Sequence, residues 1–528
     1  MRYSMLLFLA IIGIACAGGN HSAAVTPVAA AAADDLQTQS PDTTIQGFTT
    51  VQGADLMARL EAAQTRARAR QTPYWSAYTF DVRPGIAVDP AIREFNGTMN
   101  TMGDTVVFIG TTSAGVTVET RSLAIFLLRD PASNQITRME VYNLERKREY
   151  SGYPVYWLGR ANNEESLNYM RALAAASPLD MLSERAVLGI ALHDDARVAG
   201  MLKGFVTSSP NQRIRSSSVY WLGQVGGETT FLAGLVRSET EDKKIRRSAA
   251  HAIGQSRERG TIPTLQGLYE SVKDAEIRKS VISAAGNSLD EQPAWSFLLG
   301  ISKNDADWES RRTAVRQLGD FKRDDAAEEL MKIYNNDANV EVKRAALRSL
   351  AETKNPRGQA RLLEIARTET NPELRKSAIR VMSDRGEAAV EDLLKLFDSE
   401  QSAEVRRSIL QTLSDIKSTR VEDKLFEVAK GNDTIEVKRQ AIRLLGERAT
   451  KRSFEFLSAT AQSSDGNTEV QVQAVRAISE RRAEESVPLL IKIARTHPNQ
   501  LVRKQAIRSL GESGDPRAVD FFREVLTK

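Results

Sequence analysis

The sequence predicts a mostly α-helical protein, a right-handed α-solenoid of about 11–12 helical-hairpin repeats preceded by a small antiparallel β module. Three observations predict this fold class. A short apolar and basic pattern recurs about every 32 residues, a residue of helix N-cap type stands before each good copy, and a second amphipathic segment lies between copies. One helical hairpin cannot cover its own apolar face, whereas stacked hairpins bury a continuous core.

The recurring pattern begins with an aliphatic residue followed by a basic residue. Counted from the basic residue, a small residue stands at position +3, an aliphatic residue at +4, and Leu-Gly or a similar pair at +7 and +8. We call the basic residue the reference residue. The ten good copies are separated by steps of 31, 32 or 33 residues, with reference residues Arg215, Arg246, Arg278, Arg311, Lys343, Arg375, Arg406, Lys438, Gln471 and Arg503. Two degenerate copies are predicted earlier, at Ser183 and at Ser151, the second because residues 155–159 and 219–223 are both Val-Tyr-Trp-Leu-Gly.

Four residues before each good reference residue stands a side chain that can cap a helix. The ten caps are Asn211, Asp242, Asp274, Asp307, Asn339, Asn371, Ser402, Thr434, Asn467 and Asn499. Such side chains accept hydrogen bonds from the first N–H groups of a helix, worth about 1 kcal/mol each. Seven caps are followed two residues later by glutamate, which favours the positive end of the helix dipole. Pro372 occupies the first helical position, as proline prefers. Each copy therefore predicts the start of a helix.

Between copies, a second amphipathic segment predicts the other helix of each hairpin. Examples are residues 326–334, 359–366, 390–397 and 487–494. Within the capped helices, the positions at −1, +3, +4 and +7 from the reference residue fall on one stripe and predict the buried seam. In one copy these are Val342, Ala346, Leu347 and Leu350.

This pattern resembles HEAT repeats, particularly the short HEAT-like kind found in bilin lyases, over residues 146–528. The resemblance implies that the capped second helices line an inner, concave wall. Lyase activity is not carried over, because no catalytic motif matches residue by residue. Deoxyhypusine hydroxylases, a HEAT-repeat enzyme class, hold iron on paired His-Glu motifs, and this chain has no His-Glu dipeptide.

The reference residues lie at the edge of the seam, which leaves two interpretations. They could form a basic binding ladder, or they could join the loops of adjacent repeats, and we favour the second. The +1 basic residues follow the cap-proximal glutamates by three positions, an attractive spacing that largely neutralises them. The +5 column has no such partner at that spacing. It is the predicted partner-binding surface, with a solvated face as the alternative: Arg316, Arg348, Arg380, Arg443, Arg476 and Arg508.

The N-terminal residues predict export. Residues 1–17 have the pattern of a signal peptide, with Arg2, an apolar core at 6–15 and small residues around Cys16. Residues 13–16 resemble a lipoprotein box, so lipid anchoring at Cys16 and simple cleavage both stay open. We expect the protein in the periplasm or cell envelope, without a membrane span, because no later apolar run approaches about 20 residues. Residues 18–50 predict a disordered tether rich in Ala, Thr and Ser.

Residues 51–145 predict a helix followed by an antiparallel β module. The helix is expected at 54–70 and the strands at 74–82, 105–111, 116–128 and 135–144, separated by turn signals. The aromatic residues Tyr74, Trp75, Tyr78 and Phe80 could present a ligand-stacking face. The alternative, which we favour, is that they are buried.

The composition argues against several functions. Lys and Arg number 72 against 68 for Asp and Glu, a net charge of +4, so no global field indicates a nucleic-acid partner. One cysteine and four scattered histidines indicate no metal site, and no phosphate-binding loop or activated nucleophile is evident. We therefore expect a non-enzymatic scaffold without cofactors that binds a protein. The alternatives are an enzyme or accessory subunit with its activity in the β module, and a polyanion binder that uses the +5 column.

Overall fold

The computed structural model describes residues 45–89, 95–102, 105–112, 116–176, 180–256, 258–463 and 466–527. The chain forms two compact units. The sheet unit comprises the described residues up to Phe80 together with Ser122–Asn162, and the helical unit comprises those of Asp81–Arg121 together with Asn163–Lys528. The predicted signal peptide, Cys16 and most of the predicted tether lie outside the described residues.

The sheet unit holds helix α1 (Leu56–Arg68) and a five-stranded sheet of order β1-β8-β2-β6-β7. Its strands are β1 (Thr49–Thr50), β2 (Tyr74–Thr79), β6 (Leu123–Arg129), β7 (Ile136–Asn143) and β8 (Val155–Arg160). Strands β2, β6 and β7 pair antiparallel, as predicted, but β8 pairs parallel with both β1 and β2. The sheet is therefore mixed. The helix predicted at 54–70 is confirmed.

The prediction of a first helical repeat at Ser151 is wrong. Residues 155–160 form strand β8, whose first four side chains are buried. The chain enters this strand through Ser151 and Gly152, both with positive φ (56° and 72°), and then through Pro154. Proline disfavours helical backbone in the residue before it, so no helix runs through residues 151–153 into 155–159, and pairing with β1 and β2 holds Val155–Arg160 as a strand.

The single β module predicted for 51–145 is also corrected, because its strands divide between the two units. Strands β3 (Ala87–Val88), β4 (Phe95–Met102) and β5 (Thr105–Thr112) form a three-stranded antiparallel sheet of order β3-β5-β4 in the helical unit. The strand predicted at 116–128 begins only at Leu123, since the described residues before it pair irregularly. The hairpin signal at 113–115 lies outside the described residues.

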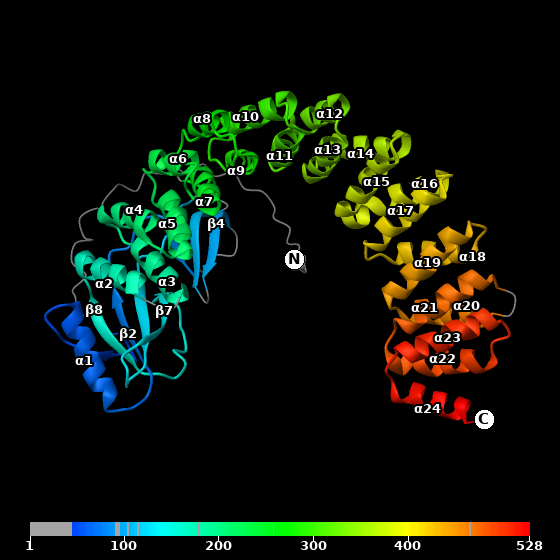
Figure 1. Cartoon of the computed structure of the whole chain (residues 1–528), viewed down its shortest axis with the longest axis horizontal. Coiled ribbons are helices and arrows are strands. Elements are labelled where there is room, and N and C mark those ends of the chain that lie inside the picture. The colour runs from blue at the N-terminus through cyan, green and yellow to red at the C-terminus, as the bar shows by residue number, and fades with distance from the viewer. Residues whose placement is uncertain are drawn as a thin grey trace, which may run out of the picture. The chain divides into compact units, whose positions relative to one another are not determined.

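The helical unit consists of paired helices that follow one another along the chain (Figure 1). Among the described residues there are eleven pairs followed by α24. The first helices are α2 (Asn163–Ala176), α4 (Arg197–Ser208), α6 (Thr229–Arg237), α8 (Ile262–Ser271), α10 (Glu291–Asn304), α12 (Ala326–Asn336), α14 (Pro356–Thr368), α16 (Val390–Ser399), α18 (Thr419–Lys430), α20 (Lys451–Gln462) and α22 (Ala483–Thr496), and α24 is Pro516–Leu526.

The second helices are α3 (Asp180–Ala191), α5 (Gln212–Val225), α7 (Lys243–Gly254), α9 (Ala275–Ala285), α11 (Trp308–Leu318), α13 (Val340–Glu352), α15 (Pro372–Val381), α17 (Ala403–Ser414), α19 (Ile435–Arg448), α21 (Thr468–Ser479) and α23 (Gln500–Glu512). We call α5 to α23 of this row the capped helices. All ten predicted caps stand at the N-cap position, and nine accept a backbone N–H. Thr434 stands there without such a bond. Ser183 lies in α3, so the second degenerate copy is helical.

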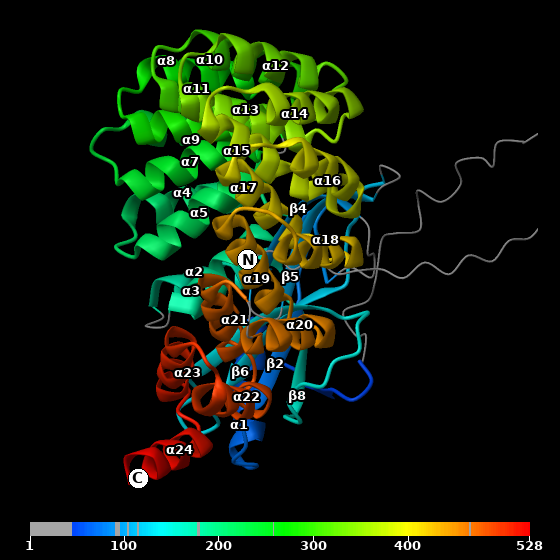
Figure 2. The ribbon, with the colours of Figure 1, turned by 90° about the vertical axis from the view of Figure 1, so that its right-hand side faces the viewer.

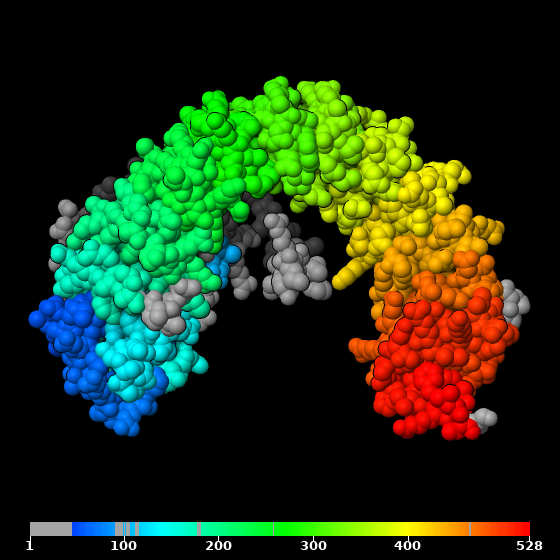
Figure 3. All heavy atoms as spheres, in the orientation of Figure 1, coloured from blue at the N-terminus to red at the C-terminus, as the bar shows by residue number. Residues whose placement is uncertain are grey.

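The predicted seam forms the core of the helical unit. Each capped helix packs against its own first helix, and each except α23 also packs against the next capped helix. Figure 1 shows α8, α10 and α12 in one row and α9, α11 and α13 in another, Figure 2 shows the helices turned by 90°, and Figure 3 shows successive repeats in contact. Glycine or another small residue at +8 permits this close approach, because a Cβ on Gly319 would lie 2.7 Å from the Cβ of Ser349.

One repeat departs from the pattern. Helix α15 ends at Val381 and continues as a 3-10 segment, η1 (Met382–Ala389), in which Gly386 has a φ of 57°. A hollow of about 900 Å³ lies beside this segment, lined among others by Gln359, Leu363 and Arg385. In the part of the chain that the structure describes, no helix is both long enough and apolar enough to cross a membrane.

Candidate protein-binding surface

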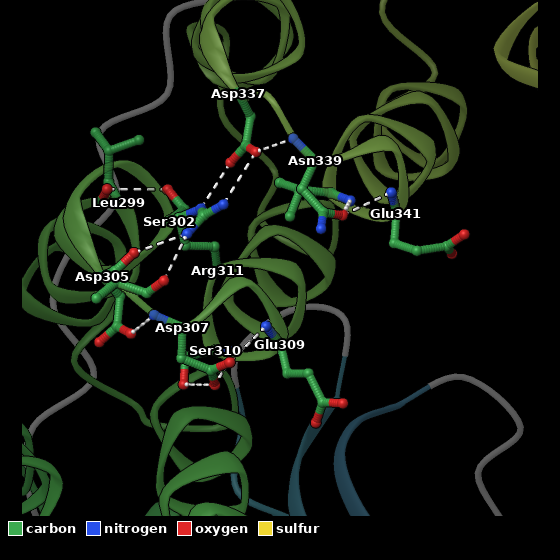
Figure 4. A network of polar contacts seen from close by, with 12 residues as sticks. Leu299, Ser302, Asp305, Asp307, Glu309, Ser310, Arg311, Asp337, Asn339 and Glu341 are labelled. Atoms are coloured by element: carbon green, nitrogen blue, oxygen red, sulfur yellow. Dashed lines mark hydrogen bonds and ion pairs between the residues drawn. The ribbon is translucent and has the colours of Figure 1, made fainter.

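The reference residues join neighbouring repeats. Arg311 of α11 donates from Nη1 to the carbonyl oxygen of Asp305, at 2.9 Å, in the loop before its own helix. Its Nε and Nη2 donate to the carboxylate of Asp337 in the next loop, at 2.7 and 3.1 Å (Figure 4). Asp337 in turn accepts the backbone N–H of Asn339, the cap of α13. One guanidinium therefore fixes two loops and the start of the following helix.

Burial opposes the charged form of Asp337, but hydrogen bonds from Arg311 and from the N–H of Asn339 outweigh it and lower the pKa of this carboxyl. The side chains of Arg311 and Asp337 are largely shielded from solvent. The carboxylate therefore stays ionised at neutral pH, and the pair is a permanent link between the two repeats.

The same link recurs along the array. Reference arginines pair with an acid in the next loop in five repeats: Arg215–Glu241, Arg278–Asp305, Arg311–Asp337, Arg375–Glu400 and Arg406–Asp433. Others bind carbonyl oxygens of their own preceding loop or helix, as Arg246 does at Val236 and Arg503 at His497 and Pro498. The structural interpretation of the reference residues is confirmed, and they are not a free basic ladder.

Part of the +1 column is neutralised, and by more carboxylates than predicted, whereas Arg312 and Lys504 make no ion pair among the described residues. Lys279, Arg344 and Lys376 each pair with the glutamate three residues earlier in their own helix. Each also pairs with the first-turn glutamate of the next capped helix, as Lys279 does with Glu309 at 2.8 Å. Arg439 makes only the second kind of pair, with Glu469 at 3.0 Å.

Half of the predicted +5 binding residues have polar partners. Arg443 pairs with Glu447 and contacts Gln411, and Arg508 pairs with Glu512 at 2.9 Å. Arg476 donates to Gln505 of the next capped helix. The prediction concerned glutamates three residues earlier in the same helix, and it did not include the glutamates that follow Arg443 and Arg508 by four residues and pair with them. That spacing was visible in the sequence.

The other three +5 residues remain candidates. Arg316, Arg348 and Arg380 are exposed, lie on the consecutive capped helices α11, α13 and α15, and make no ion pair among the described residues. Burial lowers the pKa of Arg316 and the neighbouring guanidiniums of Arg312 and Arg348 lower it further, whereas the carboxylates of Glu341 and Glu352 act in the opposite direction without outweighing them. The three residues therefore form a stripe of like charges without direct ion pairs. We call Arg316, Arg348 and Arg380 the arginine stripe.

The aromatic residues of the sheet unit do not form a ligand-stacking face. Tyr74, Trp75, Tyr78 and Phe80 are all buried. Trp75 packs edge-to-face against Phe126 with ring centroids 6.2 Å apart. The alternative prediction, that these side chains are buried, is the correct one.

A buried histidine of the helical unit was not anticipated. His193 Nδ1 lies 2.7 Å from the carbonyl oxygen of Gly189 and Nε2 lies 2.8 Å from Ser166 Oγ. Since a carbonyl only accepts, Nδ1 carries the hydrogen and Ser166 donates to Nε2. Burial lowers the pKa of His193 to about 4. This arrangement fixes a neutral imidazole in the core. No cluster of His, Cys, Asp and Glu suited to a metal ion occurs among the described residues.

Comparisons with known proteins show similarity to helical-repeat proteins. A family model described as HEAT repeats matches residues 296–383, 390–466 and 459–528. No curated protein matches the sequence. A crystal structure of a Kap121p mutant is 12% identical with a TM-score of 0.36, and the similarity covers 69% of this chain and 47% of Kap121p. This chain thus spans about half the length of Kap121p.

Two further solved structures are covered over most of their length. The CpcE–CpcF complex of phycocyanin lyase from Nostoc sp. PCC7120 is 18% identical, covered over 92% of its chain and 47% of this one, with a TM-score of 0.25. Human deoxyhypusine hydroxylase in complex with glycerol is 17% identical, covered over 95% of its chain and 48% of this one, with a TM-score of 0.23. At these identities the similarity is one of fold.

Proposed function

We propose that the protein is a non-catalytic scaffold that holds an acidic segment of another protein along its capped helices, in keeping with the match of residues 296–383, 390–466 and 459–528 to HEAT repeats. The observation that carries the proposal is the arginine stripe. Arg316, Arg348 and Arg380 are exposed at the same position of three successive repeats, and none of them makes an ion pair with a described carboxylate. Like charges placed together cost stability, so a binding role accounts for their presence.

The charges beside the stripe favour a protein over a nucleic acid or another polyanion. The glutamates that pair with +1 residues are partly exposed next to the stripe, among them Glu341, Glu373 and Glu404. These would repel a phosphate backbone, which carries a charge at every short interval. A protein segment can place single carboxylates at the three arginines and basic or neutral residues at the glutamates. Three isolated arginines on a chain of net charge +4 suit such a mixed partner.

We also propose that the protein acts outside the cytoplasm. This part of the proposal rests on the apolar core at 6–15 and the small residues around Cys16. Mass spectrometry of the N-terminus of the mature protein tests it. Cleavage after residue 15 with a lipid on Cys16 would show an anchored protein, and cleavage nearby without lipid would show a released one. An uncleaved N-terminus would contradict export.

Site-specific cross-linking tests the binding surface. A photoreactive amino acid placed at Asp320 or Glu352, exposed residues four positions after Arg316 and Arg348, should cross-link a protein partner in cells, and the triple change Arg316→Glu, Arg348→Glu and Arg380→Glu should abolish the product. The matched control is the triple change Arg357→Glu, Arg367→Glu and Lys451→Glu, which reverses three exposed charges on first helices. It should leave cross-linking intact.

Salt dependence separates a protein partner from a polyanion. Heparin or single-stranded DNA bound at three phosphates would lose affinity with a slope of roughly −2 to −3 in log K against log salt. We expect no measurable binding of either at physiological salt. Tight binding of a polyanion that the stripe triple change removes would overturn the proposal of a protein partner.

A further inference from the structure

The last capped helix, α23, exposes a surface that every other capped helix buries. The +4 residue of the nine preceding capped helices is fully buried against the next repeat: Val219, Ala250, Ile282, Val315, Leu347, Ile379, Leu410, Ile442 and Val475. Its counterpart in α23, Ile507, is 42% exposed. An isoleucine at this position has the character of a core residue, but among the described residues nothing covers it.

The +8 residue of α23 shows the same contrast. In earlier repeats the backbone or a side chain of the next capped helix lies so close that a Cβ would collide, 2.5 Å from the Ala252 carbonyl oxygen at Gly223 and 2.8 Å from the Ala477 Cβ at Gly446. At Gly511 a Cβ would meet nothing within 4 Å. Helix α24 takes the place of another first helix, since it contacts α22 and α23. No described helix takes the place of a next capped helix.

The charged residues of α23 also lack the partners that a next repeat supplies. In α9, Arg278 pairs with Asp305 in the next loop and Lys279 with Glu309 in the first turn of α11, at 3.0 and 2.8 Å. In α23 the corresponding residues are Arg503 and Lys504. Arg503 reaches only carbonyl oxygens of its own loop, and Lys504 is exposed without an acidic partner in the described part of the chain.

Helices α9 and α23 share the residues that receive the next repeat. Arg278, Lys279, Ile282 and Gly286 of α9 correspond in position and type to Arg503, Lys504, Ile507 and Gly511 of α23. In α9 the loop 305–307 and α11 contact all four residues, and Gln317 packs against Gly286. The free face of α23 therefore has the apolar, steric and charge features of a surface that binds a helix like α11.

We propose that this face of α23 docks an amphipathic helix of a partner protein, added to the array as a further capped helix. The partner helix carries an acid in the loop before it for Arg503, a glutamate in its first turn for Lys504, and a flat apolar seam for Ile507 and Gly511. The site is separate from the arginine stripe, which lies on α11, α13 and α15. It adds a second, sequence-selective contact to the scaffold.

A synthetic peptide of residues 303–320, labelled with a fluorophore, is the probe, because it contains Asp305, Glu309 and the seam of α11. Titrated with the full-length protein, the peptide should show saturable binding by fluorescence anisotropy. Gly511→Leu should weaken binding at least tenfold, since it fills the space where the peptide backbone must approach. The variant should fold, because a Cβ at Gly511 meets no atom within 4 Å. Gly200→Leu, at an exposed glycine of α4 with equally open surroundings, is the matched control and should bind normally.

A charge exchange sharpens the test. Lys504→Glu should weaken binding of the peptide severalfold, and the peptide with Glu309→Lys should recover it. The stripe change Arg348→Glu should leave peptide binding unchanged, so failure of this proposal and failure of the stripe proposal are distinguishable. Absence of saturable binding to the unaltered protein would overturn the proposal. So would self-association of the full-length protein that Gly511→Leu removes, because the occupant would then be a second copy.

Discussion

The five residues Val-Tyr-Trp-Leu-Gly occur twice in this chain, and they form a strand in one unit and a helix in the other. At 155–159 they build β8 of the mixed sheet, and at 219–223 they lie inside α5. In both places the valine, tryptophan and leucine are buried. The five residues are therefore compatible with a strand or a helix, and the flanking residues and tertiary contacts determine which of the two forms.

The residues that lead into the pentapeptide differ between the two places. Before α5, Asn211 accepts the N–H groups of Arg213 and Ile214 and starts a helix eight residues upstream. Before β8, the positive φ of Ser151 and Gly152 and the presence of Pro154 set an extended path. A helix requires a start that satisfies its first N–H groups, and only one of the two sites has one.

The shared glycine serves a different purpose in each place. Gly159 has a φ of 73°, a backbone conformation that other residues adopt at a cost. Gly223 is helical, but a Cβ there would lie 2.5 Å from the carbonyl oxygen of Ala252 on the next capped helix. One glycine is required by its own backbone and the other by its neighbour.

The largest expected effect is the loss of either tryptophan. Trp157→Ala and Trp221→Ala should each cost about 3–5 kcal/mol, because each removes a large buried side chain and leaves a cavity. Denaturant unfolding followed by proteolysis and mass spectrometry should show that Trp157→Ala lowers the midpoint of the sheet unit and Trp221→Ala that of the helical unit. Equal effects of either change on both units would contradict the separation of the two folds.

The second-largest expected effect is a loss of stability of the helical unit at acidic pH. His193, in the helical unit, has its pKa lowered to about 4 by burial. The unfolded chain, with an ordinary histidine pKa near 6.5, binds the proton first, so stability falls as the pH drops from about 6.5 towards 4. Between pH 7 and pH 5 the helical unit should lose about 2 kcal/mol. His193→Gln should flatten this dependence in pH-resolved unfolding, and an unchanged slope would exclude His193 as its cause.

Three glycine substitutions sharpen the comparison at smaller scale. Gly223→Ala should cost about 1–3 kcal/mol through overpacking against the next helix, and Gly159→Ala about 1 kcal/mol through its positive φ. Gly511→Ala occupies the same repeat position as Gly223 but has open space, so it should be neutral or stabilise α23 by up to about 1 kcal/mol. Thermal unfolding of the three variants checks this order. A costly Gly511→Ala would show that this face is not free.

The smallest effect expected concerns the helix start itself. Asn211→Ala should destabilise the helical unit by about 1 kcal/mol, because the first N–H groups of α5 lose their acceptor. Thr434→Ala should change stability much less, since Thr434 caps no N–H through its side chain. Denaturant midpoints of the two variants give the comparison, and a larger loss for Thr434→Ala would contradict the cap assignments.

Most of the helical unit could be predicted because its determinants are local. The caps, the seam and the basic residue at its edge recur at a fixed period, and each acts within one helix or on the next repeat. The first-turn pairs such as Glu276–Lys279 follow the same rule. The missed pairs of Arg443 and Arg508 were local as well, and attention to the glutamates four residues later would have found them.

The β regions could not be assigned in the same way, because strand pairing depends on residues far apart in the chain. The strand at 105–112 was foreseen, but nothing within it indicates that it pairs with β3 and β4 and not with β2 or β6. Likewise, the parallel pairing of β8 joins it to β2, 80 residues earlier in the chain, and to β1, 107 residues earlier. Periodicity carries no information about such partners. The exposure of Ile507 on α23 likewise depends on the arrangement of whole repeats and not on the residues around it in the sequence.

The link between a reference arginine and the acid of the next loop has a consequence for how such a protein can change in length. Five junctions are made of the same two kinds of group. Removing one whole period, from Asp337 to Thr368, would bring Arg311 opposite Glu369 and restore an equivalent pair. Duplication of a period would do the same. Gene segments that encode whole periods can therefore be lost or copied while the junctions stay intact, and the reach of the scaffold can evolve separately from its stability.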